Sequence, residues 1–354
     1  MARERIVSLG ESGVGDRDLR SAVLGVLREV LGFGAYVWLL TDPVSEVGAA
    51  PLADVPCLPE LPALVKAKYA TAVNRWTALR RQGPARLLTE ATGGDLARSL
   101  VWRQVLSRYG IADVASVVLA DRHGCWGFLD LWRDDTAGPF AAADAAFLAD
   151  VAGPLAGALR RCQARTFTAP ATAHRHDAGP VVLTVDDGLR IIGRTAASQA
   201  WLDVLLPPRP AEQAIPASVY NVAAQLLAVE AGVDDHPPYA RTHLAGGFWL
   251  TLRAARLSSN ALRNARAVAA SEIAVTIEET PAAGRLDLFG RACGLTARER
   301  ELLGLLATGS DTRTLARQMS LSEHTVTDHL KSIFAKTGAR DRVTVLSRAL
   351  GTQP

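Results

Sequence analysis

The side chains best suited to specific chemistry lie in one run near the end of the chain, residues 322–336. Its polar and apolar residues each recur at the spacing of one helix face. The polar face carries His324, Thr327, Asp328 and Lys331, and the apolar face carries Val326, Leu330, Ile333 and Phe334. A helix anchored on one side that presents donors and acceptors on the other can hydrogen-bond to base edges in a DNA groove. We therefore predict a recognition helix over residues 322–336.

Helix start signals around this run indicate the elements that must hold it. Thr296 and Glu299 have the spacing of a capping box, in which the hydroxyl and the carboxylate each accept from a free backbone N–H. Asp311, Ser322 and Asp341 are suited to cap three further helices. Four short helices with a sharp connection between the second and the third are typical of a helix-turn-helix unit.

This part of the sequence closely resembles the LuxR-type (GerE) DNA-binding domain, over about 60 of the 354 residues. The matching positions are Leu295, Thr296, Arg298, Glu299, Leu303, Gly309, Leu315, Ala316, Ser322, Thr325, Val326, His329, Leu330, Ile333, Lys336, Gly338, Arg340 and Arg342. The resemblance implies that the third helix enters the major groove with residues 327, 328 and 331 toward the bases. It also implies phosphate contacts at positions 322, 325 and 336. The predicted DNA-binding residues are Ser322, His324, Thr325, Thr327, Asp328, Lys331, Lys336 and Arg340.

The charge of this region is weakly basic. From residue 294 to the end, nine lysines and arginines stand against six aspartates and glutamates, a net charge of +3. Thr327 stands where the family often has a basic residue, and Asp328 repels phosphate but can accept from a cytosine amino group. One copy would therefore bind weakly, and we expect a homodimer over two half-sites about one helical turn apart. The apolar side of the fourth helix is either the dimer surface or intramolecular core; its residues are Val343, Leu346 and Leu350.

Residues 1–165 have the pattern of an α+β domain. Apolar spacing predicts helices over 16–31, 64–80, 96–109 and 143–162, a strand over 35–40, and a β-hairpin with strands 115–120 and 125–132. The strand GCWGFLDLWR followed by PFAAADAAFL resembles the last strands and last helix of the GAF family. We therefore expect a GAF-like sensor domain here.

Several side chains of this domain have more than one interpretation. The tryptophans Trp38, Trp102, Trp126 and Trp132 either line a cavity for a flat or apolar ligand or form core, and we favour core. Cys125, which no histidine follows directly, is expected to be a packing residue. His123 lies in the hairpin turn and is expected to be exposed to solvent.

The middle of the chain divides into a linker, residues 166–179, and a second α+β domain, residues 180–283. The linker is rich in small and polar residues, and its two histidines, His174 and His176, lack further ligands at metal-binding spacing. We expect strands over 180–185, 189–194, 239–244, 248–255 and 273–278, and helices over 196–205 and 219–229. The opening VVLTVDDGLRIIGRTAASQAWL resembles the first hairpin and helix of the PAS family.

Composition excludes some classes of function. Charged residues are 21% of the chain, no stretch approaches about 18 uninterrupted apolar residues, and the start of the chain has no cleavage signal. We therefore expect a cytoplasmic protein with no membrane partner, and expect its four cysteines to be reduced. The sequence contains no phosphate-binding glycine loop, nucleophile elbow or cluster of catalytic carboxylates, so we expect no enzyme activity, no cofactor and no metal.

Together these patterns predict a multidomain protein, with an all-α helix-turn-helix domain over residues 284–354 after the two α+β domains. We expect a transcriptional regulator that binds double-stranded promoter or operator DNA as a homodimer. Its two N-terminal domains either gate DNA binding by sensing a small molecule or bind protein partners instead. Both alternatives are open at the level of sequence.

Overall fold

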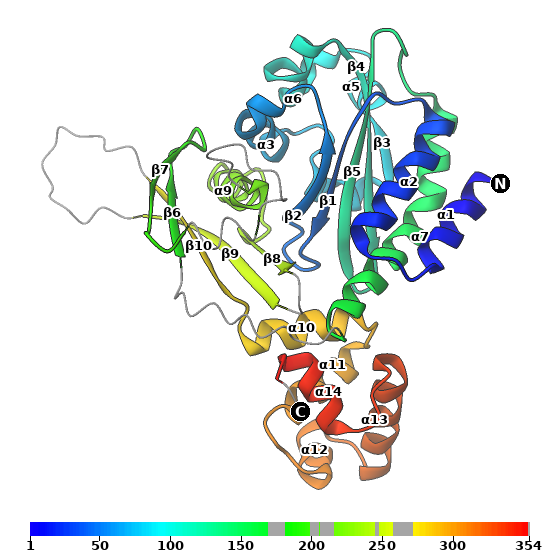
Figure 1. Cartoon of the computed structure of the whole chain (residues 1–354), viewed down its shortest axis with the longest axis vertical. Coiled ribbons are helices and arrows are strands. Elements are labelled where there is room, and N and C mark those ends of the chain that lie inside the picture. Colours follow the sequence, from blue (N-terminus) through cyan, green and yellow to red (C-terminus); the bar gives the residue numbers. More distant parts are fainter. Residues whose placement is uncertain (169–180, 199–204, 206–215, 245–247, 258–271, 353–354) are drawn as a thin grey trace, which may run out of the picture.

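The computed structural model describes residues 1–168, 181–198, 205, 216–244, 248–257 and 272–352 (Figure 1). Predicted features at 169–179, at 199–204 with Trp201, at the prolines 207, 208 and 210, and at the turn 245–247 lie outside these residues. The chain folds into two five-stranded antiparallel sheets and a C-terminal group of helices. Both sheets place their strands in the same order, with the second, first, fifth, fourth and third strand side by side.

The first sheet has helices on both faces (Figure 1). Its order is β2 (Gly48–Asp54), β1 (Ala35–Thr41), β5 (Gly124–Asp134), β4 (Ile111–Asp121) and β3 (Ala85–Leu87). One face is covered by α2 (Asp16–Leu31) and α7 (Ala142–Thr166), and α1 (Ala2–Glu11) packs on these two helices. The other face lies toward α3 (Leu61–Ala70), α4 (Trp76–Gln82), α5 (Leu88–Thr92) and α6 (Leu100–Gln104). Because both faces are covered, β4 and β5 are buried along nearly their whole length, which explains their continuous apolar sequence.

The second sheet packs against the first domain through helix α9 (Ala217–Glu230) and through its edge strand β8 (Tyr239–Leu244). Its order is β7 (Ile191–Arg194), β6 (Val181–Val185), β10 (Ile273–Glu279), β9 (Phe248–Arg256) and β8. Helix α9 contacts β9 on one side and α3 and β2 of the first domain on the other. A helix that is apolar on most of its surface is expected in such a position. The two domains therefore share a hydrophobic core.

The C-terminal helices follow a connecting helix that the sequence did not indicate. This helix, α10 (Ala282–Ala292), packs against α7 of the first domain. The four predicted helices are α11 (Ala297–Leu306), α12 (Thr312–Met319), α13 (Glu323–Thr337) and α14 (Arg342–Leu350). The core that α7 forms with the first sheet continues without interruption into these helices.

Two segments of the first domain that were each predicted as one helix form several shorter helices. The segment 64–80 forms two helices because Asn74, between α3 and α4, has φ +49°, a left-handed conformation that no α-helix contains. The segment 96–109 forms three short helices, η2 (Leu96–Arg98), α6 and η3 (Leu106–Tyr109). Separate pieces that pack on one core satisfy the same apolar spacing, so the spacing does not distinguish them from one helix.

The sequence analysis also missed α1, β2 and β3. Strand β2 contains Pro51, which argued against a strand, but β2 is an edge of its sheet, where a missing N–H donor costs little. Helix α7 is long and apolar enough to cross a membrane by length and composition, a test that a core helix also passes. Its residues Leu148, Val151, Leu155 and Leu159 are buried in the first domain's core.

Candidate nucleic-acid interface

The predicted recognition helix is α13, and its start is fixed by Ser322. The Ser322 hydroxyl accepts a hydrogen bond from the backbone N–H of Thr325 at 3.1 Å, which satisfies one of the free donors of the first turn. The helix ends at Gly338, whose φ of +61° is readily adopted by glycine. Of its predicted anchoring face, Val326, Leu330 and Ile333 are at most 5% exposed, and Phe334 is partly buried.

The opposite face of α13 is exposed and carries an ion-pair network. Lys331 Nζ lies 3.2 Å from one carboxylate oxygen of Asp328, and His324 Nε2 lies 3.5 Å from the other. The Thr327 hydroxyl donates to the carbonyl of Glu323 at 2.9 Å. Exposed pairs of this kind contribute little to stability, so the side chains of His324, Asp328 and Lys331 are available to an approaching ligand at low cost. Asp328 nevertheless offsets the positive charge that Lys331 brings to this face.

The residues predicted to contact phosphate have different environments. Arg340 is exposed just after α13, and the hydroxyls of Ser322 and Thr325 lie 2.8 Å apart at its start. Lys336 instead binds the buried capping-box residue Glu299, with Nζ 2.8 and 2.6 Å from the two carboxylate oxygens. In the described part of the chain, Lys336 therefore joins α13 to the start of α11.

Glu299 accepts from several donors. Ser332 donates at 2.6 Å and the backbone N–H of Thr296 at 2.7 Å, in addition to Lys336. Burial alone would raise the pKa of Glu299, but these hydrogen bonds outweigh burial and lower the pKa to about 2. The predicted capping box is present, because the backbone N–H of Glu299 donates in turn to the Thr296 hydroxyl. The carboxylate therefore caps one helix and fixes another.

The apolar side of α14 is divided between core and surface. Val345 and Ala349 are fully buried, whereas Val343 is 66% exposed and Leu346 and Leu350 are partly buried. Of the two alternatives for this helix, intramolecular core describes Val345 and Ala349, and an exposed surface describes Val343. Val343 is available to a partner, and the opposite side holds α14 in the domain.

Helix α10 joins the C-terminal helices to the first domain. Arg291 Nη1 donates to the carbonyl of His123 at 3.0 Å, and Arg160 on α7 donates to the carbonyl of Ala292 at 3.1 Å. Arg160 also pairs with Asp121 at 2.8 Å. His123, predicted to be exposed, is only 6% exposed because the hairpin turn that holds it packs against this junction. That prediction was wrong because the turn is covered by a segment far along the chain.

A buried ion pair joins the second domain to the first and to α10. Arg241 on β8 donates to Asp42, after β1, at 3.0 Å from Nη2 to Oδ1, and these side chains are 6% and 0% exposed. Its Nη1 also donates to the carbonyl of Gly284 at 3.0 Å and lies 3.3 Å from Asp287. Burial would lower the pKa of Arg241, but the charge of Asp42 outweighs burial and raises it. Arg241, which belongs to β8 of the second domain, therefore contacts both the first domain and α10.

The tryptophans of the first domain are mostly core residues. Trp38 and Trp126 are fully buried and Trp132 is 2% exposed, while Trp102, partly buried, donates to the carbonyl of Ile111 at 2.9 Å. Cys125 is buried, and burial raises the pKa of its thiol to about 12, consistent with a packing role. All four cysteines are free.

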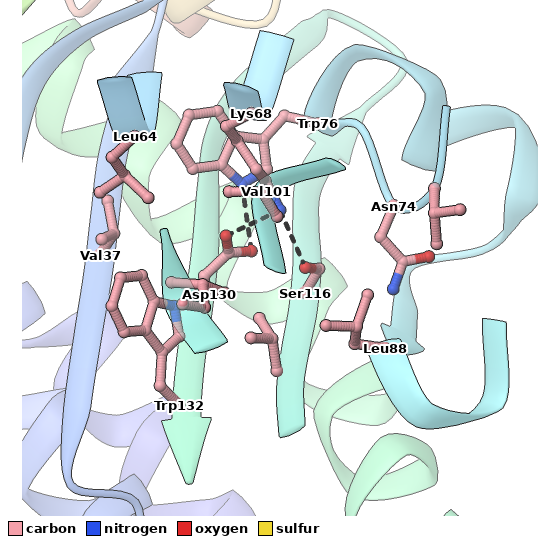
Figure 2. Close-up of a pocket in the computed structure, with 13 residues that line it drawn as sticks. Val37, Leu64, Lys68, Asn74, Trp76, Leu88, Val101, Ser116, Asp130 and Trp132 are labelled. Atoms are coloured by element: carbon pink, nitrogen blue, oxygen red, sulfur yellow. Dashed lines mark hydrogen bonds and ion pairs between the residues drawn. The ribbon is translucent and has the colours of Figure 1, made fainter. Parts of the chain in front are cut away.

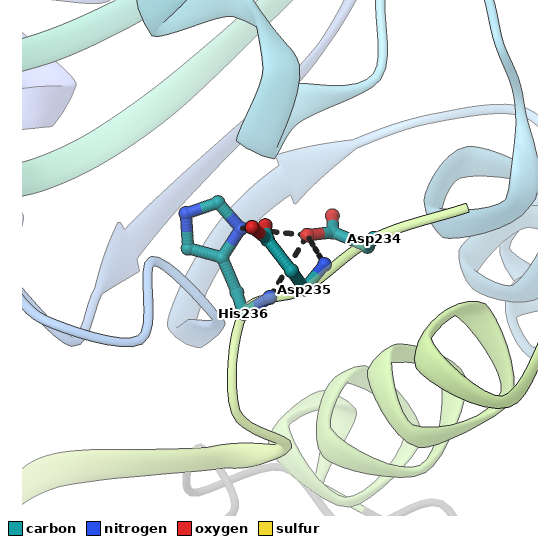
Figure 3. Close-up of side chains that lie close together, drawn as sticks. All are labelled: Asp234, Asp235 and His236. Carbon is teal, nitrogen blue, oxygen red and sulfur yellow. Dashed lines mark hydrogen bonds and ion pairs between the residues drawn. The ribbon is translucent and has the colours of Figure 1, made fainter. Parts of the chain in front are cut away.

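One cluster has side chains that metal ions use as ligands. Potential ligand atoms of Asp234, Asp235 and His236, after α9, all lie within 4.8 Å of one another (Figure 3). The Asp234 carboxylate already accepts from Arg75 at 3.1 Å, from the Thr77 hydroxyl, and from His236 Nδ1 at 2.6 Å. Because Oδ2 accepts from the first domain and Oδ1 from His236 of its own domain, Asp234 acts as a contact between domains. The sequence analysis did not single out these residues.

Comparisons with known proteins agree on the C-terminal helices. The family described as bacterial regulatory proteins, luxR family, matches residues 294–349. The monoamine regulon transcriptional regulator of Klebsiella aerogenes is 44% identical over 54 residues, which are 15% of this chain and 24% of that protein. The probable HTH-type transcriptional regulator GfsR of Streptomyces halstedii is 36% identical over 85 residues, 21% of this chain and 35% of that protein. The chain thus spans about a third or less of the length of these relatives.

Alignment of nearly the whole chain with a solved structure gives a low score. A crystal structure of Escherichia coli SdiA aligns with 99% of this chain and 97% of its own, at 11% identity and a TM-score of 0.29. That similarity is too low to support a conclusion about the N-terminal domains. The matched region coincides with the capped helices and the exposed polar face of α13. Residues 294–349, which include nearly all of helices α11 to α14, are therefore similar in sequence to the luxR family of bacterial regulatory proteins.

Proposed function

We propose that this protein is a sequence-specific transcriptional regulator that reads double-stranded promoter or operator DNA with α13. The observation that carries the proposal is the pairing of a buried and an exposed face on one capped helix, within the matched region. The buried face fixes the helix, and the exposed face presents a hydroxyl, a carboxylate and an ammonium group. We infer a cytoplasmic protein without enzyme activity.

The chemistry of the exposed face suggests how it reads DNA. Lys331 can donate to a guanine edge or to a phosphate, and Asp328 can accept from a cytosine amino group. In the free protein these two side chains bind each other at 3.2 Å, so the contact must open when DNA binds. Ser322, Thr325 and Arg340 lie at the two ends of α13, where they can contact phosphates on either side of the groove.

Two such helices are needed for useful affinity. The region has few positive charges, and Lys336 is engaged by Glu299, so one copy makes few phosphate contacts. We infer a homodimer on two half-sites, with exposed Val343 of α14 at or near the contact between copies.

We assign the control of this DNA binding to the domains over residues 1–165 and 180–283, which we take as GAF-like and PAS-like. The hydrogen bonds and ion pairs of Thr327, Asp328 and Lys331 stay within α13 in the part of the chain that the structure describes. The reading face is therefore open, and control by covering it is not supported. Control through α10 is supported, because α10 contacts α7, Arg241 and the C-terminal helices.

Genome-wide footprinting of the wild type tests the proposal and identifies the target sequence. Lys331→Ala is expected to weaken binding to the identified site by about 1–3 kcal/mol without unfolding the protein. Arg190→Ala is the matched control, because Arg190 is an equally exposed cation in the β6–β7 turn, 82% exposed. Unchanged occupancy with Lys331→Ala would show that the reading face is misplaced.

A further inference from the structure

The first domain contains an internal cavity between its sheet and the helices α3, α4 and α6 (Figure 2). Most of its wall is apolar, with Val37, Leu64, Leu88 and Val101 among the lining residues. About 390 Å³ of space, part of it open to solvent, lies between the lining side chains. The free centre admits a body of about water size, so a larger occupant requires part of the wall to move.

A buried ion pair crosses this apolar cavity. Lys68 Nζ lies 2.8 Å from Asp130 Oδ2, and the two side chains are 6% and 5% exposed. Lys68 also donates to the Ser116 hydroxyl at 3.3 Å, and the Trp76 indole N–H donates to Asp130 at 3.1 Å. A buried pair costs more desolvation than an apolar pair of the same shape, so its presence is weak evidence for a structural role. The two charges compensate each other and leave the cavity electrically neutral.

Asn74 is the feature that points to a ligand. Its side chain lines the cavity, the residue is 3% exposed, and neither its amide oxygen nor its amide nitrogen has a hydrogen-bond partner among the described residues. The indole N–H of Trp132, which also lines the cavity, has no partner among these residues either. Buried polar groups in folded proteins are nearly always paired. Asn74 also has φ +49°, so an unfavourable backbone conformation and an unpaired amide occur in the same residue.

We propose that this cavity binds a neutral, flat, largely apolar molecule with a carboxamide or lactam group. Such a group offers Asn74 an acceptor for its N–H and a donor for its carbonyl at the same time. We expect the ligand to carry no net charge. Lys68 and Asp130 neutralise each other, so a charge on the ligand would be buried without a partner. A flat apolar body suits a wall that includes the rings of Trp76 and Trp132.

The part of the wall that carries Asn74 also contacts the second domain. Asn74 lies in the connection between α3 and α4, and its neighbours Arg75 and Thr77 both bind Asp234, the carboxylate shown in Figure 3. A ligand that displaces this connection therefore acts directly on the contact between the two domains. This step deepens the control assigned to the N-terminal domains and rests on the proposed function, whereas the binding site itself does not.

Binding to the full chain is measured by calorimetry and by thermal shift with three neutral amides: benzamide, nicotinamide and 2-pyridone. We expect saturable binding of at least one of them, and little or none with toluene or benzoate, which lack the amide or carry a charge. Asn74→Gly removes the amide and suits the left-handed backbone; it is expected to weaken binding about tenfold. Asn221→Ala is the matched control, since Asn221 is a buried, unpaired amide on α9 that does not line the cavity.

A second variant tests the same cavity independently, in case Asn74→Gly fails to fold. Val101→Phe fills the cavity with apolar atoms and is expected to abolish amide binding while the melting transition remains cooperative. Absence of binding by all three amides, or equal affinity of wild type and Asn74→Gly, overturns the proposal. DNA enters none of these measurements. Failure of the cavity proposal therefore leaves the footprinting result intact, and failure of the footprinting leaves the cavity measurement intact.

Discussion

Lys336 binds both carboxylate oxygens of Glu299, at 2.6 and 2.8 Å, and so ties the end of α13 to the first turn of α11. The same carboxylate accepts from Thr296 and Ser332, and its side chain is only 4% exposed. A residue predicted from family resemblance to contact phosphate therefore has an intramolecular partner. Removal of Lys336 should change the domain's stability before it changes DNA recognition.

Lys336→Met should destabilise the C-terminal helices by about 1–3 kcal/mol, because a buried carboxylate loses its cation while the lysine itself is about one-third exposed. Hydrogen exchange of the full chain measures this as reduced protection of α11 and α13. Lys331→Met is the control, since Lys331 is 70% exposed and should leave protection unchanged. Equal effects of the two substitutions would contradict the structural role of Lys336.

The same pair predicts acid sensitivity. The pKa of Glu299 falls from 4.5 to about 2 on folding, so its stabilising contribution is complete above pH 4.5 and is lost as the pH falls through about 2. Protection of α11 and α13 should therefore decrease between pH 4.5 and 2. Glu299→Gln should lower protection at neutral pH and flatten this decrease. A steep decrease that persists in Glu299→Gln would assign the acid transition to another group.

Asp328→Asn should increase affinity for DNA of unrelated sequence. The substitution removes a negative charge from the exposed face of α13 and releases Lys331 from its 3.2 Å contact. We expect the slope of log affinity against log salt to steepen by about 1, the contribution of one phosphate contact. The comparison is a salt titration on a random duplex with wild type, Asp328→Asn and Asp235→Asn, an exposed carboxylate outside the C-terminal region. No change in slope would mean that Lys331 does not turn to phosphate.

His236 should make the contact between the two N-terminal domains sensitive to pH. Its hydrogen bond to Asp234 is the main cause that raises the pKa of His236 above 6.5, and burial opposes this shift. A raised pKa on folding means a contribution that is present below pH 6.5 and lost as the pH rises through the folded-state value. Proteolysis and hydrogen exchange around residues 71–77 should therefore increase above neutral pH. His236→Gln should remove this dependence, and an unaltered pH profile in that variant would refute it.

Asp42→Asn should lower the melting temperature of the full chain. Arg241 would remain buried with only the more distant and more exposed Asp287 as an anionic partner. We expect a loss of about 3 kcal/mol, the lower part of the range for removing one partner of a buried pair. Asp186→Asn, in the β6–β7 turn, is the control for loss of a carboxylate that is paired with an exposed arginine, Arg190. A melting temperature equal to that of the control would show that the pair contributes nothing net.

The sequence by itself determined the features that depend on near neighbours. The bounds of α2, the hairpin of β4 and β5, the caps at Thr296 and Ser322, and the two faces of α13 all follow from spacings of a few residues. Helical and strand periodicity, turn chemistry and capping act over such distances, so they can be predicted from the order of residues alone. These features include the whole exposed face of the candidate DNA interface.

Tertiary structure decided which distant side chains meet. Arg241 and Asp42 are 199 positions apart, and no local spacing relates them. The covered turn at His123, the cation that Glu299 holds, and the break at Asn74 likewise depend on how complete elements pack together. Burial then determines which polar groups are paired and which pKa values shift, because both depend on the atoms that exclude water from a site. Helix α13 and its two faces could therefore be predicted from the sequence, whereas the long-range contacts that hold it in place could not.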